Sequence, residues 1–440
     1  MFAAVEEAHG VARFVTLDSA IAASAIFIIT YVIIASERIH KTIAALAGAA
    51  VMLIFGLLSQ ETAFEHVDWN VIFLLFGMMI IAGAMRKSGV FQWLAIQSAK
   101  WTRGEPVKLM TVLVILTAVA SAVLDNVTTV VLVGPITIFL ASRLQINPVP
   151  FLIAEILASN IGGMATLIGD PPNLIVGSAA GFSFIDFLSN MLPISVILMA
   201  LLLVYVRVVF RKAMVAQSEQ RLGLMRMDAA AAIVDPVLAR RSVVVLVVTV
   251  LGFVIHGFVH LEPATIAVAG AAALMIWARL DPHESFEDVE WAGLLFFIGL
   301  FIVVGALLEA GVIGSMADQL ATWTGNDTFI TAIAIVWFAG IASGVVDNIP
   351  LAAAMVPVIQ ELGRSGMDIE PLWWSLALGA DLGGNLTAIG ASANVILITL
   401  AEREGSKISF RQFLLHGVPV TLVTLVIGTF YVWGRYFLLA

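Results

Sequence analysis

Apolar stretches long enough to cross a membrane recur along the whole chain, and they constrain the fold more than any other feature. Each has roughly 18 residues or more, enough to span the hydrocarbon core of a bilayer, which is about 30 Å thick. Of the 440 residues, 61% are hydrophobic and 12% are charged, whereas about one quarter of the residues in a soluble domain are charged. The stretches are continuous rather than alternating, which excludes a transmembrane β-barrel. We therefore predict an all-α, polytopic membrane protein.

The composition also narrows the chemistry. The chain has no cysteine, so disulfides and thiolate metal sites are excluded. It has no G-x-x-x-x-G-K-[ST] motif, so we do not expect this chain alone to use ATP. Its net charge of −9 is spread over loops and gives no sign of a nucleic-acid partner. We expect no enzymatic activity, no cofactor and no metal site.

The chain contains an internal repeat, carried by three pairs of segments. "VDWNVIFLLFGMM" at 67 matches "VEWAGLLFFIGLF" at 289, and "SAVLDN" at 121 matches "SGVVDN" at 343. "ASNIGGMATLIGDPPN" at 158 matches "GADLGGNLTAIGASAN" at 379. The pairs keep one order and an offset of 221 or 222 residues. Their shared Asp-Asn, Gly-Gly and Asn positions are not expected of unrelated apolar helices.

Each half is predicted to hold five crossings and one re-entrant hairpin. An odd number of crossings inverts the second half relative to the first, as in many secondary transporters, which bind their substrates near the membrane midplane on broken helices. The predicted units are a first repeat at 1–211 (hairpin 109–142, broken helix 149–181), a cytoplasmic connector at 212–241, and a second repeat at 242–440 (hairpin 329–362, broken helix 371–402).

The basic residues predict the orientation. With the connector in the cytoplasm, all but three of the 22 Lys and Arg residues lie on that side, the exceptions being Arg13, Arg364 and Arg435. The loops 59–70 and 309–329 have no Lys or Arg, as the positive-inside rule expects of outer loops. We predict about ten crossings, two hairpins and both termini outside.

The segment "ATLIGDPPNLIVGS", residues 165–178, cannot continue a helix through the bilayer. Pro171 and Pro172 remove two backbone donors and disfavour helix at the residues before them. Its partner in the second half, "TAIGASAN" at 387, breaks at small residues without proline. Irregular backbone at membrane depth is tolerated only where it is buried in protein or lines a cavity. Both breaks are therefore predicted to form the binding site.

Acidic residues within the apolar stretches are few, and each costs roughly 2.5–3.5 kcal/mol to insert at a helix centre. Asp125 and Asp347 lie at equivalent hairpin tips, where we expect both helix capping and function. We predict that these two and Asp381 couple transport to protons or another ion. The predicted substrate-binding residues are Asn126, Thr128, Asn160, Thr166, Asp170, Asn173, Asn348, Asp381, Asn385, Thr387 and Asn394.

No Lys or Arg lies in the broken helices or hairpin tips. A site of carboxylates and amides without a fixed cation suits protons, Na⁺ or a neutral hydroxylated solute better than a multiply charged anion. Helix N-termini and coupled Na⁺ could still bind an anion, so that alternative stays open.

At these residues the sequence resembles the ion transporter superfamily, and within it the arsenite permease, melanosomal P protein and NhaD-type antiporter group. The resemblance is carried by "LDNVTT" at 124, "ASNIGGMATLIGDPPNLIVGSA" at 158, "VDNIPLAAAMVPVI" at 346 and "LGADLGGNLTAIGASANVI" at 378. It implies a scaffold bundle and a transport bundle that alternate access. Related divalent-anion symporters carry Ser-Asn-Thr at the hairpin tips, and Pro350 here departs from that pattern.

The leading hypothesis is proton-coupled efflux of arsenite or antimonite across the inner (plasma) membrane of a bacterium. Without cysteine, the solute would be held as a small polyol by hydrogen bonds. The alternatives are a Na⁺/H⁺ antiporter and a permease for dicarboxylate, sulfate, silicate or phosphate. The expected partners are the lipid bilayer, the small inorganic solute and protons or Na⁺. A soluble ATPase (by family analogy) and a second copy of the chain are further partner hypotheses.

Overall fold

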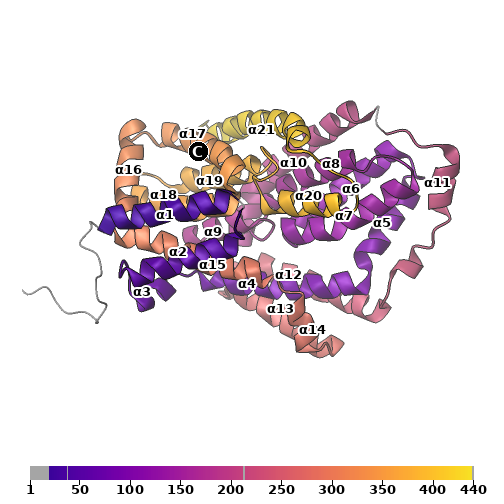
Figure 1. Ribbon diagram of the computed structural model, residues 1–440, viewed down its shortest axis with the longest axis horizontal. Coiled ribbons are helices and arrows are strands. Elements are labelled where there is room, and N and C mark those ends of the chain that lie inside the picture. Colours follow the sequence, from indigo (N-terminus) through magenta and orange to yellow (C-terminus); the bar gives the residue numbers. More distant parts are fainter. Residues whose placement is uncertain (1–18, 37, 212–213, 439–440) are drawn as a thin grey trace, which may run out of the picture.

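The computed structural model describes residues 19–36, 38–211 and 214–438, and these residues form helices and connecting turns without a strand (Figure 1). Eight of the described helices are long and apolar enough to cross a membrane. They are α1 (Ser19–Ser36), α4 (Trp69–Ser88), α7 (Asn126–Arg143), α10 (Phe184–Val209), α12 (Pro236–Val259), α15 (Trp291–Glu309), α17 (Thr328–Val346) and α21 (Phe410–Trp433). The prediction of an all-α, polytopic membrane protein is confirmed.

Four shorter apolar helices pack among the long ones: α2 (Lys41–Ile54), α6 (Pro106–Ser121), α8 (Val149–Gly163) and α13 (Pro263–Ala278). The rest of the site is built from α9 (Pro171–Ala180), α18 (Asn348–Arg364), α19 (Glu370–Gly383) and α20 (Ser392–Arg403). Helices α6 and α7 meet at a turn that ends at Asp125, and α17 and α18 meet at Asp347. Irregular turns separate α8 from α9 and α19 from α20, at the two places where helix breaks were predicted.

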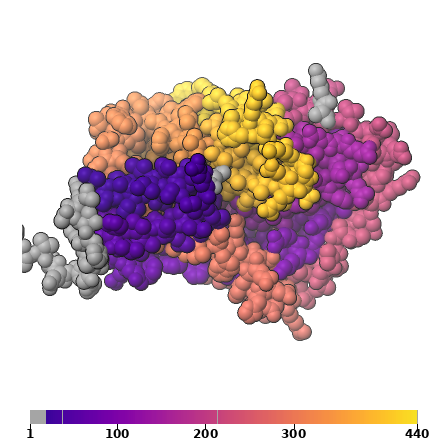
Figure 2. Space-filling view, in the orientation of Figure 1, coloured from indigo at the N-terminus to yellow at the C-terminus, as the bar shows by residue number. Residues whose placement is uncertain are grey.

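The helices pack in two groups. In one group α4 lies against α13 and α15 against α2, with α12 and α1 beside them. In the other, α6 packs on α8 and α17 on α19, while each hairpin contacts the broken helix of the other half of the chain, α7 against α20 and α18 against α9. Figure 1 shows α4, α12 and α13 in the lower part of the view and α10, α17, α19 and α21 in the upper part. Figure 2 shows the halves interleaved, because indigo N-terminal residues lie between orange residues of the second half.

Two glycines let helix backbones approach closely in the first group. A Cβ on Gly77 of α4 would lie 2.6 Å from the carbonyl carbon of Ala267 in α13. A Cβ on Gly299 of α15 would lie 2.8 Å from that of Ala45 in α2. Small residues that let helix backbones approach are a common means of packing helices in lipid. The two contacts occupy equivalent places in the two halves, 222 residues apart.

Long apolar side chains cover the outer surface of the bundle. Ile28 on α1, Val204 on α10, Val248 on α12 and Val423 on α21 are all more than half exposed. Apolar side chains that face outward along long helices are expected of a protein surrounded by lipid. The outer surface therefore agrees with the membrane location.

Several short helices lie outside the segments predicted to cross the membrane. They are α3 (Gln60–Glu65), α5 (Val90–Trp101), α11 (Ser218–Met225), the 3₁₀ turn η2 (Ala230–Ala232), α14 (Pro282–Glu287) and α16 (Val312–Trp323), while the π-helical turn η3 (Gly434–Leu438) directly follows α21. They are too short or too polar to register as crossings. Helices α11 and α16 lie at opposite ends of the molecule (Figure 1).

The boundaries of the predicted repeats and connector stay predictions, as does the orientation of the chain. Residues 1–18 and 439–440, which include both termini, lie outside the described part of the chain, and so do residues 212–213 of the connector.

Candidate functional site

Two aspartates form the tips of the hairpins, in a backbone conformation that side chains rarely adopt. Asp125 has a φ of 135° and Asp347 a φ of 84°. Asp125 Oδ1 accepts a hydrogen bond from the backbone N–H of Thr128 at 2.7 Å, and Asp347 Oδ1 accepts one from Ile349 at 3.1 Å. Such conformations cost about 1–3 kcal/mol each and are concentrated at functional sites. The predicted capping by both residues is confirmed, and the strain is an additional sign of function.

The two helix breaks are held by the same hydrogen bonds in both halves. Asn173 Nδ2 donates to the carbonyl oxygens of Gly163 at 3.3 Å and Thr166 at 3.0 Å. Asn394 Nδ2 donates to those of Gly384 at 2.7 Å and Thr387 at 2.9 Å. Each asparagine therefore satisfies two carbonyl groups that the interrupted helix leaves free.

The two threonines predicted for the site tie each break to a hairpin. The Thr166 hydroxyl donates to the carbonyl of Ala122 at 2.5 Å, and the Thr387 hydroxyl donates to that of Gly344 at 2.6 Å. Both acceptors lie just before a hairpin tip. The threonines thus have structural partners here.

Asp170 connects the hairpins of both halves. Its carboxylate accepts a hydrogen bond from Asn126 Nδ2 at 2.6 Å and another from Asn348 Nδ2 at 3.1 Å. The residue precedes α9, but its side chain makes no capping hydrogen bond there. Capping alone therefore does not explain Asp170, because the carboxylate binds the side chains that follow the two tip aspartates.

A set of asparagines continues this network across the two halves. Asn160 Nδ2 donates to Asn385 Oδ1 at 3.0 Å and to Asn394 Oδ1 at 3.1 Å. Asn126 Nδ2 also lies 3.4 Å from Asn160 Oδ1. Asp381, the residue equivalent to Asn160, is fully buried beside Asn173. The structure thus brings together most of the predicted site residues from segments more than 200 positions apart.

Thr128 is the exception among the predicted residues. It lines another cavity of about 290 Å³, with Arg86, Glu287 and Asp288. None of the asparagines of the network lines this cavity, and the site role of Thr128 stays a prediction.

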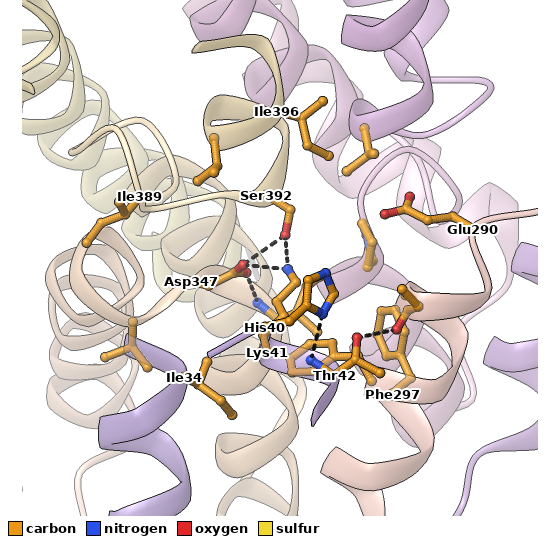
Figure 3. Close-up of a pocket in the computed structure, with 18 of the residues that line it drawn as sticks. Ile34, His40, Lys41, Thr42, Glu290, Phe297, Asp347, Ile389, Ser392 and Ile396 are labelled. Carbon is orange, nitrogen blue, oxygen red and sulfur yellow. Dashed lines mark hydrogen bonds and ion pairs between the residues drawn. The ribbon is translucent and has the colours of Figure 1, made fainter. Parts of the chain in front are cut away.

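A cavity of about 330 Å³ reaches the hairpin tips from one side of the network. Figure 3 shows Asp347, Lys41 and Ser392 pointing toward one another there, with Glu290 across the cavity. Lys41 Nζ lies 3.1 Å from Asp347 Oδ2. The Ser392 hydroxyl donates to the same oxygen at 2.8 Å, and Lys41 also donates to Ser392. Asp125 and Pro171 line the same cavity.

Lys41 is the residue that sequence reasoning missed. It is the one Lys or Arg among the described residues that line this cavity. At the start of α2 it resembles an ordinary basic residue at the membrane surface. No sequence pattern connects it with Asp347, which lies 306 residues later in the chain. Ser392 follows Ala391, the residue equivalent to Asp170. It belongs to no motif that would mark it as a site residue.

The described residues contain no cluster of three or more His, Cys, Asp or Glu side chains suited to a metal ion. The site instead presents carboxylates, amides, hydroxyls and one ammonium group. This set can bind protons, a small hydroxylated solute or one anionic group beside Lys41.

Comparisons with known proteins agree along nearly the whole chain. The family model described as CitMHS, citrate transporter, matches residues 31–379. The 46 kDa membrane protein of Mycobacterium leprae is 42% identical over 422 residues, which cover 94% of this chain and 98% of that protein. The uncharacterized transporter Rv2684 of Mycobacterium tuberculosis is 44% identical, covering 95% and 99%.

Two further comparisons are with a mammalian protein and with a solved transporter structure. The P protein of Mus musculus is 33% identical over 496 residues, covering 93% of this chain and 60% of that protein. In structure, the chain is similar to the YdaH transporter of Alcanivorax borkumensis, with a TM-score of 0.60 over 95% of this chain and 98% of that one. At 13% sequence identity this last similarity shows the fold alone.

Proposed function

Because the chain belongs to the CitMHS citrate transporter family of the ion transporter superfamily and is a membrane transporter, we propose that it is a proton-coupled secondary transporter that exports a small hydroxylated solute, arsenite or antimonite. The observation that carries this proposal is the chemistry of the inner site. Asp170 and the asparagines around it bring hydrogen-bond donors and acceptors from both halves of the chain to one place.

Arsenite near neutral pH is mostly an uncharged trihydroxide, which can donate and accept hydrogen bonds on every side. Asn126 and Asn348 already donate to one carboxylate, and a solute hydroxyl could take their place or that of Asp170. The cavity of about 330 Å³ beside the tips is large enough for such a solute. The absence of cysteine does not oppose this, because binding then depends on hydrogen bonds.

The carboxylates at the hairpin tips supply the coupling to protons. Asp125 and Asp347 are nearly buried and line the cavity. In the proposal, a proton that binds Asp347 removes the charge that holds Lys41 of α2 to the second hairpin. The hairpin is then free to move relative to α2, and the solute is released in exchange for the proton.

A second candidate is an organic anion such as citrate, and two observations favour it. The matching family model is described as a citrate transporter, and Lys41 with His40 places basic groups in the cavity. Against it, Asp125, Asp347 and Glu290 line the same cavity, so an anion would have to overcome three neighbouring acidic side chains.

The proposal is tested by solute accumulation in proteoliposomes under an imposed pH gradient. Arsenite should accumulate against its gradient when protons leave, and excess citrate should not compete. Accumulation of citrate with no effect of arsenite would favour the second candidate. A response to Na⁺ alone would place the protein among Na⁺/H⁺ antiporters and contradict the proposal.

A further inference from the structure

One difference between the two halves of the chain lies in a pair of equivalent side chains in the polar network. In one pair, Asn160 Nδ2 donates to Asn394 Oδ1 at 3.1 Å. The equivalent pair, at an offset of 221 residues, is Asp381 and Asn173. An amide donor in the first pair is thus replaced by a carboxyl group in the second.

The hydrogen bonds of Asn173 fix the direction of its amide. Its Nδ2 donates to the Gly163 and Thr166 carbonyls, as Asn394 Nδ2 does to the Gly384 and Thr387 carbonyls. A flipped amide would set its oxygen against two carbonyl oxygens, so Asn173 Oδ1 must lie on the opposite side. From the equivalence of the two pairs we infer that this oxygen lies toward Asp381, as Asn394 Oδ1 lies toward Asn160.

Three oxygen atoms at this place lack a donor. Asn173 Oδ1 and both carboxyl oxygens of Asp381 have no hydrogen-bond partner within the described part of the chain. Both side chains are 0% exposed. A buried polar group without a partner costs about 1–3 kcal/mol, and more if it is charged. What these three oxygens lack is a hydrogen-bond donor between the two side chains.

The charged groups around Asp381 do not supply it. Asp170 interacts electrostatically with Asp381, and also with Asp347 and Asp125, so these neighbours are acidic and bring no positive charge. Lys41, the cation at the cavity, is already paired with Asp347. A single proton on Asp381 turns one carboxyl oxygen into a donor and restores the hydrogen bond that Asn160 makes in the other pair.

We propose that Asp381 holds a proton, which it donates to Asn173 Oδ1, and that this is an occluded proton site of the transport cycle. The cavity reaches Pro171, next to Asp170, whereas Asp381 is sealed in this state. Release of the proton requires α19 and α9 to separate. The role in transport rests on the proposed function, but the presence of the proton does not.

The test is infrared difference spectroscopy of the purified full-length protein in lipid at neutral pH, without solute. The wild type should show the carbonyl stretch of a buried, protonated carboxylic acid. Asp381→Asn should remove the Asp381 component of this band, leaving any contribution from the buried Glu155. It should still fold, because its amide supplies the donor that Asn160 supplies in the first half. Asp381→Glu should move the band rather than abolish it. Asp125→Asn, which changes an acid at the cavity, should leave this band in place.

Several results would overturn the inference. They are a wild type without the band, a band that is undiminished in Asp381→Asn, and a band of which Asp381→Glu moves no part. Na⁺ that raises the melting temperature of the wild type but not of Asp381→Asn would assign the site to a metal cation instead. In proteoliposomes, Asp381→Asn should reduce pH-gradient-driven transport at least tenfold. Because the infrared band needs no solute, an error about arsenite leaves it unaffected.

Discussion

Lys41 in α2 and Asp347 at the second hairpin tip form an ion pair, with Nζ and Oδ2 3.1 Å apart, across 306 positions of sequence. The pair joins the two groups of helices, because α2 packs on α15 while the hairpin packs on α9 and α19. Ser392 at the start of α20 completes it with hydrogen bonds to both residues. One contact thus links a helix of the first group, a hairpin and a broken helix.

Replacement of Lys41 by alanine should destabilise the protein and impair transport. The side chains of Lys41 and Asp347 are 29% and 12% exposed, so the loss should lie between that of a surface pair and that of a buried one, about 1–3 kcal/mol. The measurement is the melting temperature in detergent together with transport in proteoliposomes. Lys407→Ala, which removes an exposed pair with Glu402, is the matched control and should change both by much less. Equal effects of the two variants would contradict the role of Lys41.

The strained hairpin tip allows carboxylate chemistry to be separated from backbone conformation. At a φ of 135° Asp125 occupies a region that glycine adopts at little cost. Asp125→Gly relieves the backbone strain but removes the cap, so we expect unchanged stability or a gain of up to about 1 kcal/mol. The melting temperature should therefore stay the same or rise. Both Asp125→Gly and Asp125→Asn should lower solute flux at least tenfold. Normal flux in Asp125→Gly would show that the carboxylate is not required.

The close helix contacts at Gly77 and Gly299 leave no room for a larger side chain. Alanine at either position must push the facing helix away, at a cost of about 1–3 kcal/mol. Gly314 in α16 has no atom within 4 Å of an added Cβ, so Gly314→Ala should instead stabilise its helix by about 0.5–1 kcal/mol. Melting temperatures of the three variants provide the check. A stable Gly77→Ala protein would mean that these helices approach less closely than described.

The side chain of Asn394 makes three hydrogen bonds, donating two and accepting one. Asn394→Ala removes two bonds to the helix break and the one from Asn160, and it leaves their buried partners unsatisfied. We expect a loss of at least about 2–3 kcal/mol and no measurable transport. Asn147→Ala, which removes one partly buried hydrogen bond from the backbone N–H of Val149, should lower the melting temperature only slightly. A similar small effect of Asn394→Ala would argue against a rigid break.

The sequence predicted the features that depend on local chemistry. Long apolar stretches predicted the crossings, and Pro171 and Pro172 predicted the first break within a few residues, because proline cannot continue the helix before it. The Asp-Asn pairs at 125 and 347 marked both hairpin turns. The family followed from the same motifs, since they are specific to it.

Features that depend on packing between distant segments could not be predicted. Nothing in the sequence places Lys41 beside Asp347, or Asp170 between Asn126 and Asn348. Helices α5 and α16 were missed because they are short and partly polar. Thr128 follows Asn126 in the motif but lines another cavity, because position on a helix, rather than order in the chain, decides which way a side chain points.

The measurement that tests the central claim most directly is solute-driven proton movement. Proteoliposomes without a pH gradient would receive arsenite on one side, with an internal pH dye as the readout. The account predicts that protons move against the direction of arsenite flow, and that a protein carrying both Asp125→Asn and Asp347→Asn shows no movement. Arsenite flow without any pH change, or a pH change that persists in the double variant, would contradict proton coupling through the hairpin tips.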